Sequence, residues 1–186
     1  MLHHFLQTKK FIPSEFHQTF FDINFKELYQ KGYRLLLCDL DNTLISYDET
    51  LPTKEILEVF KTIKEIGFEL ILISNNVPSR IAEFTKDLDL KGFANARKPL
   101  AIGIKKAVNA SNVKDKNQMV LIGDQLLTDI WAANRYGVYS ILVNPLKKKT
   151  EKWYTKMNRK TEIKMLEKIK TNYPDIWKEK GLDQRK

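Results

Sequence analysis

The sequence predicts an α/β protein built on a parallel, doubly wound sheet of five strands. Three observations lead to this prediction: apolar runs recur along the chain, segments with helical spacing separate them, and polar residues directly follow several of the runs. The apolar runs cover residues 34–38, 69–73, 92–95, 119–122 and 139–143. Strands that alternate with helices in this way form βαβ units, which build parallel sheets with helices on both faces.

Helical spacing is clearest between the first two runs. Ile56, Phe60 and Ile63 fall on one side of a helix that Thr53 can begin and Gly67 can end. Further helices are expected over residues 79–88, 100–109 and 128–136. Each of these segments lies between two apolar runs, as the crossover between two parallel strands requires.

Three regions differ in composition. Residues 1–33 are rich in Phe and Tyr and are expected to form an arm that packs on the core; an aromatic surface at a lipid interface is the alternative. Residues 34–146 form the predicted core. Residues 147–186 hold fourteen Lys or Arg against six Asp or Glu, so this tail carries +8 of the formal net charge of +9. We expect a basic amphipathic helical tail that packs on the core or binds an anionic surface.

Composition also bears on the compartment. No run of about 18 apolar residues could span a bilayer, and residues 1–10 lack the apolar centre of a secretory signal. The single cysteine, Cys38, excludes an internal disulfide framework and fits a reducing cytosol. Within a buried strand it is expected to pack as a small hydrophobic residue rather than to act as a nucleophile. A cytoplasmic protein is expected, with the tail as its candidate contact to a membrane.

The first apolar run ends in two aspartates, Asp39 and Asp41, separated by one residue. Alternation along an extended strand puts both on roughly the same side. Two carboxylates at about 4 Å repel each other by about 4 kcal/mol at an effective dielectric constant near 20. A turn that needed only a cap would not need both, so the pair predicts a bound cation or a shared proton.

Polar residues follow the later runs as well. They are Ser74-Asn75-Asn76, then Lys98 before a proline, then Gly123-Asp124, with Asp129 at the start of the next helix. Each alone suits an ordinary turn, an exposed lysine or a helix cap. Because parallel strands share one carboxyl edge, all of them are expected around one crevice, where ligands bind in such sheets. Oxygen ligands favour Mg²⁺, and no cluster of His or Cys supports zinc.

In these motifs the chain resembles the haloacid dehalogenase (HAD) superfamily of phosphohydrolases over about residues 34–144. Asp39-Leu40-Asp41-Asn42-Thr43 matches the first family motif, Ser74 the second, Lys98 the third, and Gly123-Asp124 with Asp129 the fourth. The resemblance implies a Rossmann-like sheet of five parallel strands, Mg²⁺ and a covalent aspartyl-phosphate.

It also implies residue roles. Asp39 would be the nucleophile and Asp41 the general acid and base, with Thr43 holding their loop. Ser74, Asn75 and Lys98 would bind the phosphoryl group. Magnesium would be held by Asp39, by the backbone carbonyl of Asp41 and by Asp124, while Asp129 would support the metal from behind.

The intervals between motifs are too short for an inserted domain, so the chain resembles the capless subfamily IIIA. Such inserts act as lids in this superfamily, and their lack predicts an open site that takes bulky substrates, unless a partner chain supplies a lid. The aromatic arm and the tail segment Thr155-Lys156-Met157-Asn158-Arg159 resemble YqeG-type proteins, which are related to phosphatidylglycerophosphatases. This implies a lipid phosphate as substrate and a peripheral position on an anionic membrane.

Alternatives remain at this stage. The substrate could be another bulky phosphate ester, such as a phosphoprotein or a nucleic-acid end. A phospho-receiver module would lack the acid–base aspartate two residues after the acceptor, which Asp41 supplies here. A nucleic-acid-associated module is disfavoured because the tail lacks an evident base-stacking motif. The sequence does not indicate an oligomeric state.

Overall fold

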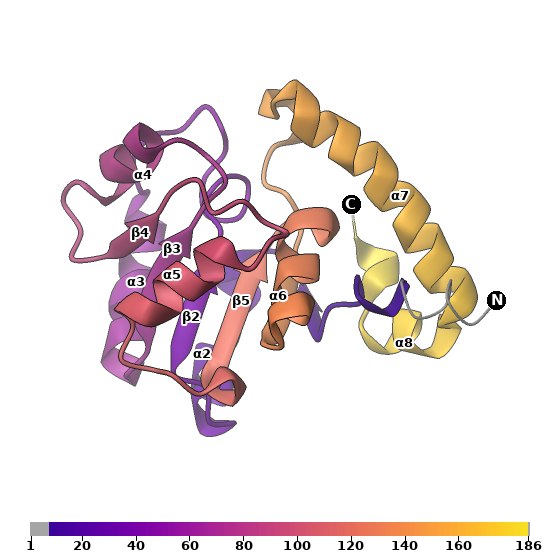
Figure 1. Cartoon of the computed structure of the whole chain (residues 1–186), viewed down its shortest axis with the longest axis horizontal. Coiled ribbons are helices and arrows are strands. Elements are labelled where there is room, and N and C mark those ends of the chain that lie inside the picture. The colour runs from indigo at the N-terminus through magenta and orange to yellow at the C-terminus, as the bar shows by residue number, and fades with distance from the viewer. Residues whose placement is uncertain (1–7, 186) are drawn as a thin grey trace.

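The computed structural model describes residues 8–185, which form a parallel sheet between two layers of helices (Figure 1). The sheet has six strands in the order β1-β6-β5-β2-β3-β4. Their bounds are β1 (Glu15–His17), β2 (Leu35–Cys38), β3 (Glu69–Ile73), β4 (Lys91–Phe93), β5 (Met119–Gly123) and β6 (Tyr139–Val143). The predicted fold class is confirmed.

The strand count of five was wrong, because the aromatic arm adds β1 to the sheet. β1 pairs in parallel with β6, with Glu15 opposite Ile141 and His17 opposite Val143. A strand of three residues without an apolar run gives no periodic signal in the sequence. It forms because an edge strand such as β6 would otherwise leave its backbone groups unpaired. The first seven residues of the arm lie outside the described residues.

Side chains alternate along β2 and divide the core into two layers. Leu36 and Cys38 pack with α2 (Phe25–Gln30), α3 (Lys54–Ile66) and α4 (Pro78–Thr85) on one face. Leu35 and Leu37 pack with α5 (Ile102–Ala110) and α6 (Trp131–Tyr136) on the other. A strand covered on both faces must be apolar throughout, as this run is. Cys38 is fully buried, and burial raises the pKa of its thiol well above the ordinary value, so it packs as predicted.

The expected helices are present with shifted ends. Thr53 caps α3 by accepting a hydrogen bond from the Ile56 amide at 3.3 Å, and Gly67 ends it in the left-handed region at φ 110°. The segment expected as one helix over 128–136 is instead a π-helical turn, Leu126–Ile130, followed by α6. This π-helical turn begins two residues after Asp124 and contains Asp129, so its wider geometry sets where Asp129 lies.

Register aligns the strand ends that carry the polar motifs. Cys38 at the end of β2 lies opposite Leu72 on one side and Ile122 on the other. The next residue, Asp39, donates its amide hydrogen to the Ile122 carbonyl at 2.9 Å. Residues that follow β2, β3 and β5 therefore meet at one edge of the sheet.

The tail forms α7 (Trp153–Asn172) and α8 (Pro174–Glu179). Ile169 is buried near the far end of α7 in a cluster with Phe11, Leu126, Leu142 and Leu182. Three apolar residues of α7 instead face outward: Trp153, Met157 and Ile163 are 73%, 59% and 58% exposed. Its buried positions are Thr155, Glu162 and Ile169. Among the helices that the model describes, none is both long and apolar enough to cross a bilayer.

Candidate active site

The ammonium group of Lys98 lies between two buried carboxylates at the sheet edge. Its Nζ is 2.7 Å from Asp39 Oδ1 and 2.6 Å from Asp129 Oδ1, and it donates to the Ile73 carbonyl at 2.9 Å. Its side chain is 2% exposed. One cation thus links the motifs that follow β2, β4 and β5, as the sequence predicted for a single crevice.

Asp124 is paired with two arginines of the tail. Arg159 contacts Asp124 Oδ2 and donates to its backbone carbonyl at 2.9 Å. The same guanidinium lies 2.8 Å from Glu151 and 2.9 Å from Glu162. Arg185 donates to the Asp124 carbonyl at 2.8 Å and lies 3.5 Å from Glu162. The cost of burying Asp124, Glu151 and Glu162 at the end of β5 is therefore offset by the two arginines of the tail.

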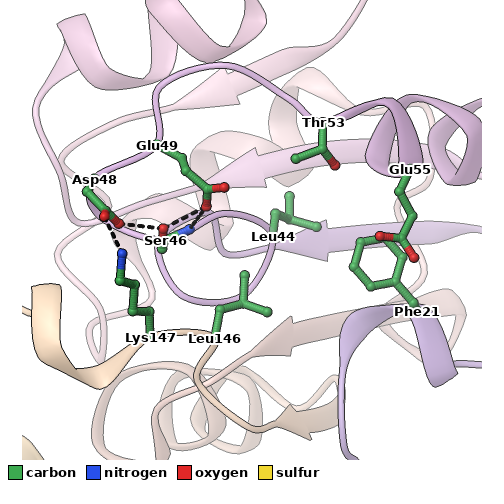
Figure 2. Close-up of a pocket in the computed structure, with 9 residues that line it drawn as sticks. All are labelled: Phe21, Leu44, Ser46, Asp48, Glu49, Thr53, Glu55, Leu146 and Lys147. Atoms are coloured by element: carbon green, nitrogen blue, oxygen red, sulfur yellow. Dashed lines mark hydrogen bonds and ion pairs between the residues drawn. The ribbon is translucent and has the colours of Figure 1, made fainter.

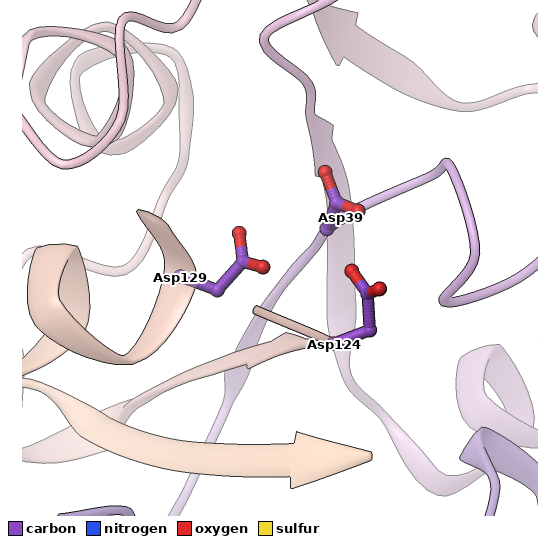
Figure 3. A group of neighbouring side chains, drawn as sticks. All are labelled: Asp39, Asp124 and Asp129. Carbon is purple, nitrogen blue, oxygen red and sulfur yellow. The ribbon is translucent and has the colours of Figure 1, made fainter. Parts of the chain in front are cut away.

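Oxygen atoms of Asp39, Asp124 and Asp129 lie within 4.8 Å of one another, and Figure 3 shows the three carboxylates converging. The hydroxyl of Thr43 lies between the first two, 3.3 Å from Asp39 Oδ2 and 3.5 Å from Asp124 Oδ1. The glycine at 123 permits this approach, since a Cβ there would lie 2.3 Å from Asp129 Cγ. A buried set of carboxylate oxygens fits a hard divalent cation such as Mg²⁺.

The carboxylate of Asp41 is held on the opposite side of the loop. Its Oδ1 accepts a hydrogen bond from Arg80 Nε at 3.1 Å and lies 3.0 Å from Arg80 Nη2 in an ion pair. Its Oδ2 accepts from Asn76 Nδ2 at 3.1 Å and from the Ser74 hydroxyl at 3.4 Å. Arg80 in turn donates to the backbone carbonyls of Ser46 and Glu49. These contacts fix the direction of the Asp41 carboxylate, which is not part of the three-carboxylate group.

The loop that anchors Arg80 borders a second, wider pocket of about 450 Å³ (Figure 2). Its polar groups pair with one another: Ser46 donates to Asp48 and Glu49 at 2.6 Å each, and Asp48 also contacts Lys147. Hydrogen bonds from Lys147 and, to a smaller extent, from the Ser46 hydroxyl lower the pKa of Asp48 to about 2. This network stiffens the loop behind Asp41.

Asn75 connects two of the motifs. Its side-chain amide donates to the Lys98 carbonyl at 2.9 Å, and its Oδ1 accepts from the Lys98 amide at 2.7 Å. The pair fixes the backbone from which Lys98 reaches the carboxylates. Asn75 and Ser74 also line the same small pocket as Asp39 and Asp41.

Burial dominates the charge balance of the site. It raises the pKa of Asp39 well above the ordinary value; Asp129 and Asp124 add to this, whereas Lys98 opposes it. Burial also disfavours the Lys98 ammonium, but the two carboxylates that it contacts outweigh this and raise its pKa. Burial raises the pKa of Asp124 to about 6 against the opposing charge of Arg159. A divalent cation here would favour the ionised carboxylates.

The pocket over these groups is small and partly covered, and whether it admits bulky substrates stays a prediction. It measures about 70 Å³ and is lined by strand-end residues together with Tyr154, Thr155 and Asn158 of α7. Tyr47 and Thr155 are hydrogen-bonded at 3.2 Å, and Lys152 donates to Asn76 at 3.0 Å. No cap domain is inserted between the motifs, because only α3 and β3, then α4 and β4, separate them. The start of the tail helix covers the pocket instead.

Sequence reasoning missed three residues of this region. Arg80 lies one helical turn into α4, and its partner Asp41 is distant in sequence. Arg159 was one of fourteen basic residues in the tail. Glu162, three positions after it and therefore on the same helix face, was the available signal. Gln125 directly follows the Gly123-Asp124 motif but was not singled out, and it lines the pocket.

Substitution of Arg159 by lysine should destabilise the protein by about 1–3 kcal/mol, since an ammonium cannot reach three buried acids with the planar geometry of a guanidinium. Urea denaturation measures the change. Lys160→Ala, at the exposed neighbouring position, is the matched control and should shift the unfolding free energy by less than about 0.5 kcal/mol. An unchanged midpoint in Arg159→Lys would contradict a bridging role.

The fold and this pocket together define a class of protein. The parallel strands bring Asp39 and its partner Lys98 to a shared acidic pocket, in the motif order given above. This combination places the chain among HAD-type phosphatases. The family is narrower than the class. The model of the family described as mitochondrial PGP phosphatase matches residues 1–146, and the chain belongs to this family. The protein is therefore a phosphatase.

Individual relatives agree with this assignment. The chain is 34% identical over 171 residues to the probable phosphatase YqeG of Bacillus subtilis (strain 168), covering 92% of this chain and 98% of the relative. It is 24% identical to phosphatidylglycerophosphate phosphatase 1, chloroplastic/mitochondrial, of Arabidopsis thaliana, covering 86% of this chain and 46% of the plant protein. An uncharacterized protein from Listeria monocytogenes serotype 4b shares the fold, with a TM-score of 0.50, 22% identity, and coverage of 62% of this chain and 83% of that one.

Proposed function

We propose that the protein is a Mg²⁺-dependent phosphomonoester hydrolase that works through an aspartyl-phosphate on Asp39. The observation that carries this proposal is the position of Asp39, whose carboxylate lines a small pocket, contacts Lys98 at 2.7 Å and lies within 4.8 Å of Asp124 and Asp129. Asp39, Asp124 and the backbone carbonyl of Asp41 would hold the ion. Both oxygens of Asp129 already accept hydrogen bonds, from Lys98 and the Gln125 amide, which suits a supporting role.

In the first step, a carboxylate oxygen of Asp39 forms a bond to phosphorus while the bond from phosphorus to the alcohol oxygen breaks. The bound cation would offset the repulsion between this carboxylate and the phosphate dianion. Lys98 supplies a fixed positive charge beside the reacting oxygen, and Ser74 and Asn75 stand at the pocket wall to bind phosphoryl oxygens. Thr43 holds Asp39 in place through its hydroxyl.

Asp41 is the proposed acid and base of the two steps. It would give a proton to the leaving alkoxide and then take one from the water that hydrolyses the acyl phosphate, regenerating Asp39. Its carboxylate lines the pocket, and contacts with Arg80 and Asn76 fix its direction.

A lipid phosphate, phosphatidylglycerophosphate, is the best single substrate. Its support is the family membership and the name of the plant relative. Lysines on the exposed side of α7, Lys156, Lys160, Lys164 and Lys168, could hold the protein on an anionic membrane from the cytoplasmic side. A phosphoprotein or a nucleic-acid end is the alternative substrate.

A panel of phosphate esters tests the proposal. The protein is assayed with Mg²⁺ on five substrates: phosphatidylglycerophosphate in mixed micelles, an aryl phosphate, a nucleotide, a sugar phosphate and a phosphopeptide. Turnover of the lipid at least about tenfold above every soluble ester in kcat/KM supports the lipid assignment. A preference for a soluble ester overturns that assignment, and turnover of none overturns the hydrolase.

Magnesium should stabilise the folded protein, because three carboxylates gathered within 4.8 Å repel one another. At about 100 times the Kd, Mg²⁺ should add about 2.7 kcal/mol to the free energy of unfolding, and EDTA should reverse this. Thermal denaturation with Mg²⁺, with Ca²⁺ and with EDTA measures it without any need for activity. Asp124→Asn should lose most of the shift, whereas Asp87→Asn, at an exposed position, should keep it. A shift equal in both variants would contradict a magnesium site here.

A further inference from the structure

One buried oxygen of a residue that lines the pocket lacks a hydrogen-bond partner. Among residues 8–185, Gln125 Oε1 is the buried side-chain oxygen or nitrogen for which no donor or acceptor is in reach. A buried amide oxygen without a partner costs about 1–3 kcal/mol, so such atoms are rare and call for an explanation. Gln125 lines the same pocket as Asp39, and the explanation we pursue is a donor on the substrate.

The pocket has two chemically different walls. One contains the groups assigned above to the reaction: the charged residues Asp39, Asp41 and Lys98, and the neutral residues Ser74 and Asn75. The other consists of neutral polar side chains: Gln125 and Thr128 after β5, and Tyr154, Thr155 and Asn158 at the start of α7. In Figure 1, α7 begins on the side of the sheet toward which β5 points. The neutral wall therefore belongs to the edge where the reaction would occur.

A volume of about 70 Å³ leaves room for little beyond the phosphoryl group. The first atoms of the leaving alcohol then come close to the remaining lining residues, the neutral ones among them. Amide and hydroxyl side chains at such a wall suit a neutral hydroxylated group. Each of them can both donate a hydrogen bond to a hydroxyl group and accept one from it. An aliphatic group there would leave Gln125 Oε1 without a partner.

We propose that Gln125, together with Asn158 and Thr155 of α7, forms a subsite that accepts a free hydroxyl group on the alcohol part of the phosphomonoester, with Gln125 Oε1 as the acceptor. This inference rests on the proposed function and makes it more specific: the preferred substrates are esters of polyols. A glycerol-based lipid phosphate satisfies this requirement, as does a soluble polyol phosphate. The tail helix thus takes part in substrate selection and is not only a surface anchor.

Two esters with the same carbon skeleton test the subsite. Glycerol 3-phosphate carries free hydroxyls and n-propyl phosphate carries none. The kcat/KM of the full-length protein with Mg²⁺ should favour glycerol 3-phosphate by at least about tenfold, because the analogue leaves a buried acceptor unpaired. In Gln125→Leu the ratio of the two kcat/KM values should fall to near 1. Partial unfolding of a variant cancels in this ratio, since both esters report on the same active fraction.

Controls separate the possible results. Thr161→Ala, at an exposed position of α7, should keep the wild-type ratio. If Gln125→Leu turns over neither ester, calorimetric binding of the two esters to Asp39→Asn protein replaces the rate ratio, and equal Kd values overturn the subsite. A ratio near 1 in the wild type, or an unchanged ratio in Gln125→Leu, also overturns it and means that Oε1 binds only water.

If glycerol 3-phosphate and ethanolamine phosphate are turned over equally well, the subsite accepts a hydrogen bond from a hydroxyl or an ammonium group alike, and the hydroxyl assignment fails. Loss of turnover on every ester, an aryl phosphate included, would instead refute the proposed hydrolase.

Discussion

Substitution of Asp39 by asparagine should reduce phosphatase activity by at least about 10³-fold, since an amide oxygen is a poor nucleophile and cannot carry the acyl phosphate. The fold should persist, because Lys98 keeps its contacts with Asp129 at 2.6 Å and with the Ile73 carbonyl at 2.9 Å. Turnover of an aryl phosphate and thermal denaturation are measured on the same preparation. Rapid quenching of the wild-type reaction, followed by mass spectrometry, should locate a phosphoryl group on the peptide that contains Asp39.

Asp87→Asn is the matched control for this variant, because it makes the same chemical change at an exposed position. It should retain wild-type activity and stability. Full activity in Asp39→Asn, or a phosphoryl group trapped elsewhere, would end the proposed mechanism. A phosphoryl group on Asp39 that persists for hours would favour a phospho-receiver module over a hydrolase.

Substitution of Lys98 by methionine should destabilise the protein by about 3–5 kcal/mol, since it leaves two buried carboxylates without their shared counter-ion. Activity should fall by about 10²-fold or more in the folded fraction, because the reacting oxygen of Asp39 loses the fixed charge beside it. Urea denaturation at pH 7 gives the stability change. Turnover per folded molecule gives the second effect separately.

The loss of stability in Lys98→Met should depend on pH in a defined direction. Burial already raises the pKa of Asp39, and removal of the ammonium raises it further. A carboxyl whose folded-state pKa exceeds its unfolded value favours folding when protonated, so the penalty is largest at neutral pH and shrinks as the pH falls toward about 4. Lys91→Met, whose side chain is 54% exposed, should change stability by less than about 1 kcal/mol at either pH. Equal stabilities of wild type and Lys98→Met at pH 7 would contradict the buried triad.

The tail gives the site a feature that motif spacing alone does not reveal. The chain lacks an inserted cap domain, yet Tyr154, Thr155 and Asn158 line the pocket and Arg159 balances the charge of Asp124. The family model matches residues 1–146, so this cover lies beyond the matched segment. Relatives that differ after this point could combine the same strand-end groups with different leaving-group selectivity.

Local sequence determined the parallel sheet, the order of its central strands and the set of polar residues at their ends. Apolar runs, helical spacing and glycine stops act over a few residues, and a parallel sheet must bring its strand ends to one edge. Asp39, Lys98 and Asp124 could therefore be placed together before any coordinates were known.

Only the tertiary structure decided how these charges are balanced and what covers them. Arg159 pairs with Asp124 across a long sequence separation and also with Glu151. β1 exists because β6 offered it an edge, and Trp153 faces outward although the tail looked amphipathic around it. The physical reason is the same in each case: buried charges and unpaired backbone groups are costly whatever segment compensates them, and no local periodicity records which distant segment will do so.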